Sequence, residues 1–231
     1  MPTEQAFVRP PADFLENAAK QLKARWRQHY RPSPPTPSPN RMHVAFAIGT
    51  MVADNYLAFQ ARDAQQFRNN SQDLLNYCRV LGIAEKLSPY VMSGSKMAET
   101  EDWPALRSKI FETQEHIVAL LMEQRDDDPS KLVTLGLWFR LLDITASLAA
   151  DDTELKDKMV TIGDLGVIES LVTHYKSLTE ATRADEDLAL AGNALELLQR
   201  HWTGQANQPT QELVELTRTK LKFVITKVTD K

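Results

Sequence analysis

The chain has 231 residues, and its 42% hydrophobic and 25% charged residues are the ordinary balance of a globular protein with a core. One cysteine excludes a disulfide framework and a thiolate metal cage built within the chain, and 8 glycines leave little material for phosphate-binding loops. The net charge of -4 is unevenly distributed, since residues 1–41 hold seven Lys or Arg against three acids. Residues 42–231 are therefore acidic overall, which disfavours binding to nucleic acid.

An amphipathic helix is predicted in the N-terminal arm, residues 1–30, from Ala12 to Tyr30. Apolar residues recur there at intervals of three and four, and basic residues take the other positions. The arm can pack on its own body, swap onto a second subunit or lie on an anionic membrane, and its modest basic charge favours the first two. Its candidate binding residues are Leu15, Leu22, Trp26 and Tyr30.

A proline-rich linker is predicted at residues 31–40. Five prolines fall between Arg31 and Pro39, so this stretch suits neither a helix nor a central strand. We expect polyproline II, which at about 3.1 Å per residue makes a stiff tether of roughly 25 Å. The linker would then separate the arm from the third predicted domain, residues 41–231.

An all-α bundle of about eight helices is predicted for residues 41–231 from the 3.6-residue period of its apolar residues. Gly82 offers a helix stop through positive φ, and Pro104 suits a first helical turn. No Asn-Gly or Asp-Gly turn separates alternating runs, so strands are not expected. The predicted helices span 41–63, 64–81, 85–97, 101–125, 131–150, 164–179, 184–202 and 210–228.

Two apolar helices show a weak internal similarity. Gly49 is followed by Asp54, and Gly136 is followed by Asp143, with gaps of five and seven residues. If the duplication is real, it implies two similar helical halves. The first helix and the run from Leu132 to Arg140 resemble a group of bacterial all-helical proteins of unassigned function, many of them exported. The resemblance covers about residues 40–180 and implies only a helical fold, with no catalytic residues.

A polar cluster is predicted inside the bundle from Asp54, Arg140 and Asp143. Asp54 shares a helix face with small apolar residues, so its carboxylate would lose water and needs a hydrogen bond, a cation or a proton. Arg140 lies in the most apolar helix and is the natural cation, with Asp143 as a local partner. The cluster is either a buried ion network that sets helix register, which we favour, or a ligand or proton site.

No pattern of catalytic residues is apparent. The five histidines are scattered without an HExxH motif, and the elbow and glycine-loop motifs of hydrolases, kinases and dehydrogenases are absent. Cys78 lies on an apolar helix face and reads as a buried structural thiol. We therefore expect no catalytic residues, no metal and no cofactor.

We expect a non-enzymatic helical module that binds a protein partner or forms a homo-oligomer. The alternative is a carrier or sensor of small, apolar molecules, with a pocket between helices near Asp54 and Arg140. Candidate aromatic residues for such a pocket are Trp138, Phe139 and Trp202.

A cytoplasmic location is expected from the sequence as it stands. Residues 1–5 lack the basic and apolar regions of a secretory leader, and no apolar run reaches the ~18 residues of a membrane span. If a leader was trimmed, the protein would be periplasmic or exported.

Overall fold

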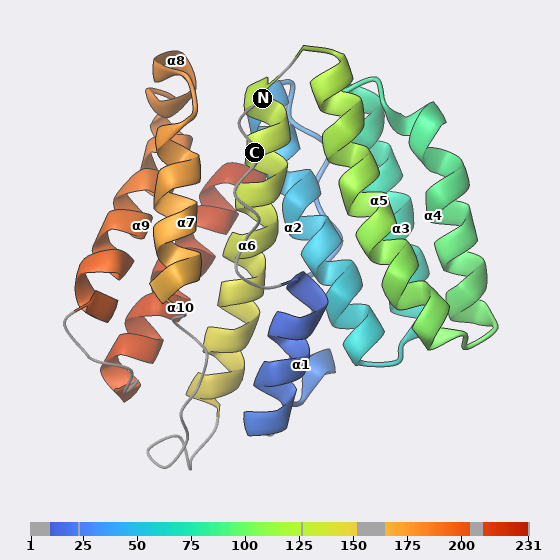
Figure 1. Cartoon of the computed structure of the whole chain (residues 1–231), viewed down its shortest axis with the longest axis horizontal. Coiled ribbons are helices and arrows are strands. Elements are labelled where there is room, and N and C mark those ends of the chain that lie inside the picture. Colours follow the sequence, from blue (N-terminus) through green and yellow to red (C-terminus); the bar gives the residue numbers. More distant parts are fainter. Residues whose placement is uncertain (1–9, 23, 126, 152–164, 204–209, 231) are drawn as a thin grey trace. The chain divides into compact units, whose positions relative to one another are not determined.

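The computed structural model describes residues 10–22, 24–125, 127–151, 165–203 and 210–230, and within these ranges it contains helices and no strand (Figure 1). The predicted all-α class is confirmed. The described residues form ten α-helices and one 3-10 helix, η1, and nine of the α-helices lie within residues 41–231, where about eight were predicted. Their bounds are α1 Pro11–Gln21, η1 Trp26–His29, α2 Arg41–Gln60, α3 Ala64–Val80, α4 Ala84–Glu99, α5 Trp103–Glu123, α6 Asp127–Ala150, α7 Leu165–Lys176, α8 Glu180–Arg183, α9 Glu186–Thr203 and α10 Gln211–Thr229.

The chain divides into two compact units. Unit 1 comprises Met1–Ala24 and Leu141–Val224, and unit 2 comprises Arg25–Arg140 and Ile225–Lys231. The boundaries fall inside α6 and α10, and they differ from the arm, linker and bundle expected from the sequence.

Unit 2 is built around α2, which is buried on nearly every side. α2 packs against α3, α5 and η1, and α4 packs against both α3 and α5 (Figure 1). A helix that is apolar on every side is stable in water only when other elements enclose it. The polar side chains that α2 carries therefore need partners from neighbouring segments.

Tight turns connect the helices of unit 2. Arg62, Gly82 and Glu101 take positive φ values of 50°, 72° and 56° just after α2, α3 and α4. This conformation lets the chain leave the helix while the last carbonyl groups remain bonded. The predicted stop at Gly82 is confirmed. Side chains of Asp63 and Asp102 then accept hydrogen bonds from the first backbone amides of α3 and α5.

Two glycines allow α2 and α6 to cross closely. A Cβ at Gly49 would overlap the carbonyl oxygen of Val133, and a Cβ at Gly136 would overlap that of Phe46. Beside this crossing the rings of Phe46 and Phe139 meet edge to face, with centroids 5.5 Å apart. The two glycine-bearing segments of the sequence thus contact each other, whereas their origin by duplication stays a prediction.

Unit 1 has its own packed interior. α9 packs against α7 and α8, and Gly192 of α9 lies against the ring of Tyr175. In the same unit the indole nitrogen of Trp202 donates to the hydroxyl of Thr217 at 3.3 Å. This pairing satisfies the polar atom of a nearly buried tryptophan.

The predicted arm helix is only partly correct. α1 ends at Gln21, because Leu22 is extended with φ -113° and ψ 152°, and η1 then occupies Trp26–His29. Leu15 and Leu22 are buried in unit 1, whereas Trp26 and Tyr30 belong to unit 2. Helix propensity is worth at most about 0.7 kcal/mol per ordinary residue, so tertiary contacts readily outweigh it. Pro32 also disfavours the helical conformation of Arg31, the residue before it.

α6 begins earlier than predicted and is rich in apolar residues. It starts at Asp127, which places Pro129 in its first turn, where a missing amide costs no hydrogen bond. By length and composition α6 could cross a membrane, yet 89% of its most apolar window is buried inside the protein. A core helix has the same pattern.

Candidate functional site

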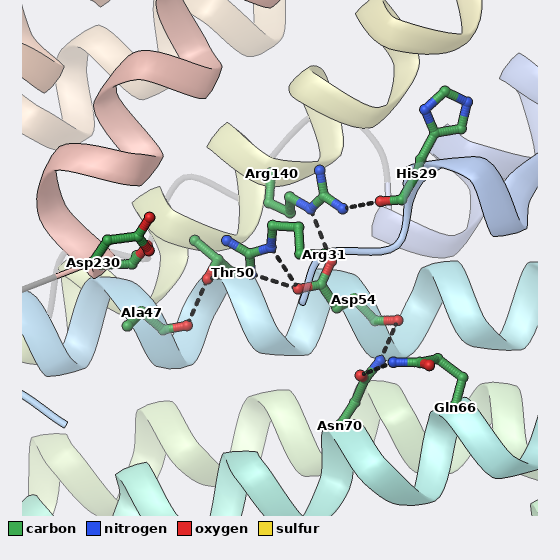
Figure 2. Close-up of polar contacts among 10 residues, drawn as sticks. His29, Arg31, Ala47, Thr50, Asp54, Gln66, Asn70, Arg140 and Asp230 are labelled. Carbon is green, nitrogen blue, oxygen red and sulfur yellow. Dashed lines mark hydrogen bonds and ion pairs between the residues drawn. The ribbon is translucent and has the colours of Figure 1, made fainter. Parts of the chain in front are cut away.

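Asp54 of α2 lies at the centre of a polar cluster in unit 2. Arg140 of α6, only 4% exposed, donates from Nε to Oδ1 of Asp54 at 2.8 Å (Figure 2). The contact expected between these two side chains is therefore present. It joins residues 86 positions apart in the chain.

A second arginine, which the sequence analysis did not assign to the cluster, completes it. Arg31 donates to Oδ2 of Asp54 from Nε at 3.0 Å and from Nη2 at 2.5 Å, and Nη2 also reaches the hydroxyl of Thr50 at 2.9 Å (Figure 2). Its side chain is 27% exposed, against 4% for Arg140. Asp54 therefore binds one buried and one partly exposed cation.

These arginines hold Asp54 in its charged form. Burial by itself would raise the pKa of Asp54, but the charges and hydrogen bonds of Arg140 and Arg31 together bring the pKa below its ordinary value. A carboxylate that stays ionised and already accepts several bonds is suited to holding a cation in place. It is poorly suited to taking up a proton near neutral pH.

The cluster also binds the chain that leads into Arg31. Nη2 of Arg140 donates to the carbonyl oxygen of His29 at 2.6 Å. One arginine thus contacts both the side chain of Asp54 and the backbone of η1. Asp143, one turn further along α6, is 4% exposed and belongs to unit 1, so its predicted place in the cluster stays a prediction.

The proline-rich segment after η1 is extended and lies along unit 2. Tyr30, with φ -64° and ψ 139°, is near polyproline II values, Asn40 is extended with φ -77° and ψ 108°, and the chain bends at Thr36 and Pro39. Every third residue is half-buried: Arg31, Pro34, Pro37 and Asn40. The residues between them are exposed, apart from Ser38. This three-residue period is that of a polyproline II helix with one face against a surface.

Further contacts fasten the same segment to α3 and its cap. The hydroxyl of Tyr77 donates to the carbonyl oxygen of Pro35 at 3.0 Å. Asp63 pairs with Arg27 at 3.3 Å and accepts from the hydroxyl of Tyr30 at 3.4 Å. The stretch expected to act as a stiff tether is bound to unit 2 at several points. We call the surface that carries Thr50, Asp54, Asp63 and Tyr77 the α2–α3 face.

The tyrosine of this face remains a hydrogen-bond donor. Burial, with smaller contributions from the charges of Asp230 and Asp73, raises the pKa of Tyr77 above its ordinary value of 10.0. The hydroxyl therefore keeps its proton at physiological pH. Backbone carbonyls of a polyproline II segment have no internal partner, so such a donor can recognise them.

The predicted aromatic residues are placed in the core. Trp138 and Phe139 of α6 are 1% and 0% exposed, and Trp202 lies in unit 1. A small cavity in unit 2 is lined by other residues, among them Asn55, Ser71 and Thr113, and neither Asp54 nor Arg140 belongs to its lining. It has room for about one water molecule. A pocket built from the predicted residues stays a prediction.

Cys78 is a buried thiol in the core, as the sequence predicted. Its side chain is 0% exposed, and burial raises the pKa of the thiol well above its ordinary value. A nucleophilic cysteine needs a lowered pKa and access to solvent. The environment of Cys78 supplies neither.

No known protein family, curated protein or solved structure matches this chain. The resemblance to bacterial all-helical proteins therefore stays a prediction.

The role of Arg31 was missed because its segment was expected to be a tether, so no partner on the bundle was assigned to it. One signal was available. Arg31, Pro34 and Pro37 are spaced three apart, which in polyproline II places an arginine and two prolines on the same face.

Proposed function

We propose that this protein is a non-enzymatic helical interaction module that binds a protein partner or a second copy of itself through unit 2. The observation that carries the proposal is the way the α2–α3 face holds residues 25–40. A largely buried carboxylate binds an arginine, a tyrosine hydroxyl donates to a backbone carbonyl, and residues 30–40 form neither helix nor strand. These are the contacts by which proteins recognise peptide segments of other chains.

The alternative, a carrier or sensor with a pocket near Asp54 and Arg140, is less well supported. The carboxylate of Asp54 already binds two arginines, and Arg31 also bonds Thr50. A ligand there would have to displace charged hydrogen bonds, which are the stronger kind. The interaction module is better supported, because an arginine of a partner would replace the bonds that Arg31 makes to Asp54, whereas a small apolar ligand would not.

The test uses full-length protein and three variants. Self-association is measured by light scattering, and partners cross-linked in the producing cells are purified and titrated against each protein. Arg31→Ala loosens the resident segment and Tyr77→Phe removes a donor of the face. Arg68→Ala is the control, since it removes an exposed ion pair with Glu99 and a hydrogen bond to Gln65, both away from the α2–α3 face. We expect Arg31→Ala to change the measured affinity by about tenfold or more, and the control to leave it unchanged.

Two results would refute the proposal. One is a partner whose affinity is the same for wild type, Arg31→Ala and Tyr77→Phe. The other is a protein that stays monomeric and yields no purified partner that binds it.

A further inference from the structure

We propose that the α2–α3 face is a binding site for polyproline II peptides of the form Arg-x-x-Pro-x-x-Pro, and that residues 31–37 occupy it in the resting protein. The inference rests on the proposed function and specifies its ligand.

The arginine supplies the anchor of such a ligand. Asp54 binds the guanidinium of Arg31 through two donors, and Thr50 accepts from the same group. Two donors in a planar fork favour arginine over lysine, whose ammonium cannot reproduce that geometry. Arg140 holds the carboxylate in place from the other side. The acid is therefore positioned independently of the peptide.

Proline spacing supplies the register. Pro34 and Pro37 are half-buried, whereas Pro32 and Pro35 are exposed. In polyproline II, residues three apart share a face, so the arginine fixes which prolines contact the protein. The hydroxyl of Tyr77 donates to the backbone carbonyl of Pro35. Any residue at that position has such a carbonyl, so this contact does not select a side chain. Only the first, fourth and seventh positions of the ligand are specified.

The resident segment can leave without disrupting the core. Arg31 is partly exposed, Arg27 is 69% exposed, and the Tyr77 bond goes to an exposed proline. After release, Asp54 still pairs with the buried Arg140. The resident segment competes at the effective concentration of a tethered ligand, which is about millimolar for short flexible linkers. A peptide from another chain therefore binds more tightly once this segment is loosened.

The experiment titrates a fluorescent peptide of residues 25–41 into full-length protein. We expect Arg31→Ala protein to bind it about tenfold or more tightly than wild type does, because the tethered competitor is weakened. With the Arg31→Ala protein, a peptide carrying Pro34→Ala and Pro37→Ala should bind about tenfold more weakly. The matched peptide with Pro32→Ala and Pro35→Ala has the same proline content and should bind within about threefold of the parent. A peptide with Arg31→Lys should also lose about tenfold.

Each contrary result has its own meaning. Equal losses from the two proline pairs would overturn the proposed register. No binding of any peptide to the loosened protein would overturn the ligand class, and the partner titrations decide separately whether the interaction module stands. Circular dichroism shows whether the Arg31→Ala protein folds. If it does not, the double variant Arg27→Ala with Tyr30→Phe is used in its place, because it removes the two contacts of the segment with Asp63.

Discussion

Gly49 of α2 and Gly136 of α6 face each other's helix so closely that neither position has room for a methyl group. A Cβ at Gly49 would lie 2.6 Å from the backbone nitrogen of Leu137, and one at Gly136 would lie 2.9 Å from the carbonyl carbon of Phe46. Both obstacles are backbone atoms, which move only with their helix.

Alanine at either glycine should therefore destabilise the protein. We expect Gly49→Ala and Gly136→Ala each to lower the free energy of unfolding by about 2 kcal/mol or more, as overpacked cores do. Gly94→Ala is the control, since its Cβ would meet only side-chain atoms at 3.4 Å and beyond. There the helix propensity of alanine should raise stability by up to about 1 kcal/mol. Urea denaturation measures all three, and equal effects would refute the close crossing.

The two arginines on Asp54 should differ in their contribution to stability. Arg140 is 4% exposed and Arg31 is 27% exposed. We expect Arg140→Ala to cost about 3 kcal/mol, because it breaks a buried pair, and Arg31→Ala about 1 kcal/mol. Arg68→Ala, at an exposed pair, should cost less than about 0.5 kcal/mol. A loss at Arg31 as large as that at Arg140 would contradict a displaceable segment.

Asp54 should contribute to stability in a defined pH range. Its pKa is lowered in the folded protein, so its stabilising effect is fully present above the unfolded value of about 3.9 and is lost as pH falls through the folded value. We expect wild type to be more stable than Asp54→Asn from pH 7 down to about pH 4, with the difference shrinking below that. Denaturation at several pH values tests this. A difference that shrinks already between pH 7 and pH 5 would mean that another group is responsible.

Cys78 should be unreactive in the native protein. Its thiol is fully buried and its pKa is raised by that burial, so little thiolate is present and reagents have no access. We expect a thiol reagent such as dithionitrobenzoate to react only as fast as the protein unfolds, and at once in concentrated urea. Rapid reaction under native conditions would show that α3 opens locally.

Asn55 should be replaceable by an apolar residue of similar size. Its Oδ1 atom is buried beside the small cavity and has no hydrogen-bond partner among the described residues. Such an atom costs about 1–3 kcal/mol, so Asn55→Leu should raise the free energy of unfolding by about 1 kcal/mol. Thr113→Val is the comparison, since that hydroxyl donates to the carbonyl of Lys109 at 2.7 Å. If Asn55→Leu instead destabilises the protein, the amide has a polar partner in solution.

The fold was largely predictable because helices are specified by local chemistry. The period of apolar residues located α2 to α7, α9 and α10 closely, and positive φ at Gly82 follows from its lack of a side chain. The break after α1 was not predictable in this way. Residues 22–30 contain good helix formers, and contacts of Tyr30 and Arg31 with distant acids outweigh that preference.

The candidate site was predictable only in part. A carboxylate on an apolar helix requires a cation, and that requirement alone paired Asp54 with Arg140. It did not say how many cations bind the carboxylate, or from which segment they come, so Arg31 was missed.

By itself the sequence determined that this chain is helical, where most of its helices begin and end, and that Asp54 could not remain buried alone. Those properties depend on neighbours within a few residues or on the cost of burying a charge. Only the tertiary structure decided that the proline-rich stretch lies bound along α2 and α3, and that Gly49 and Gly136 meet. Both depend on which distant segments come together, and that is decided by the packing of the whole unit.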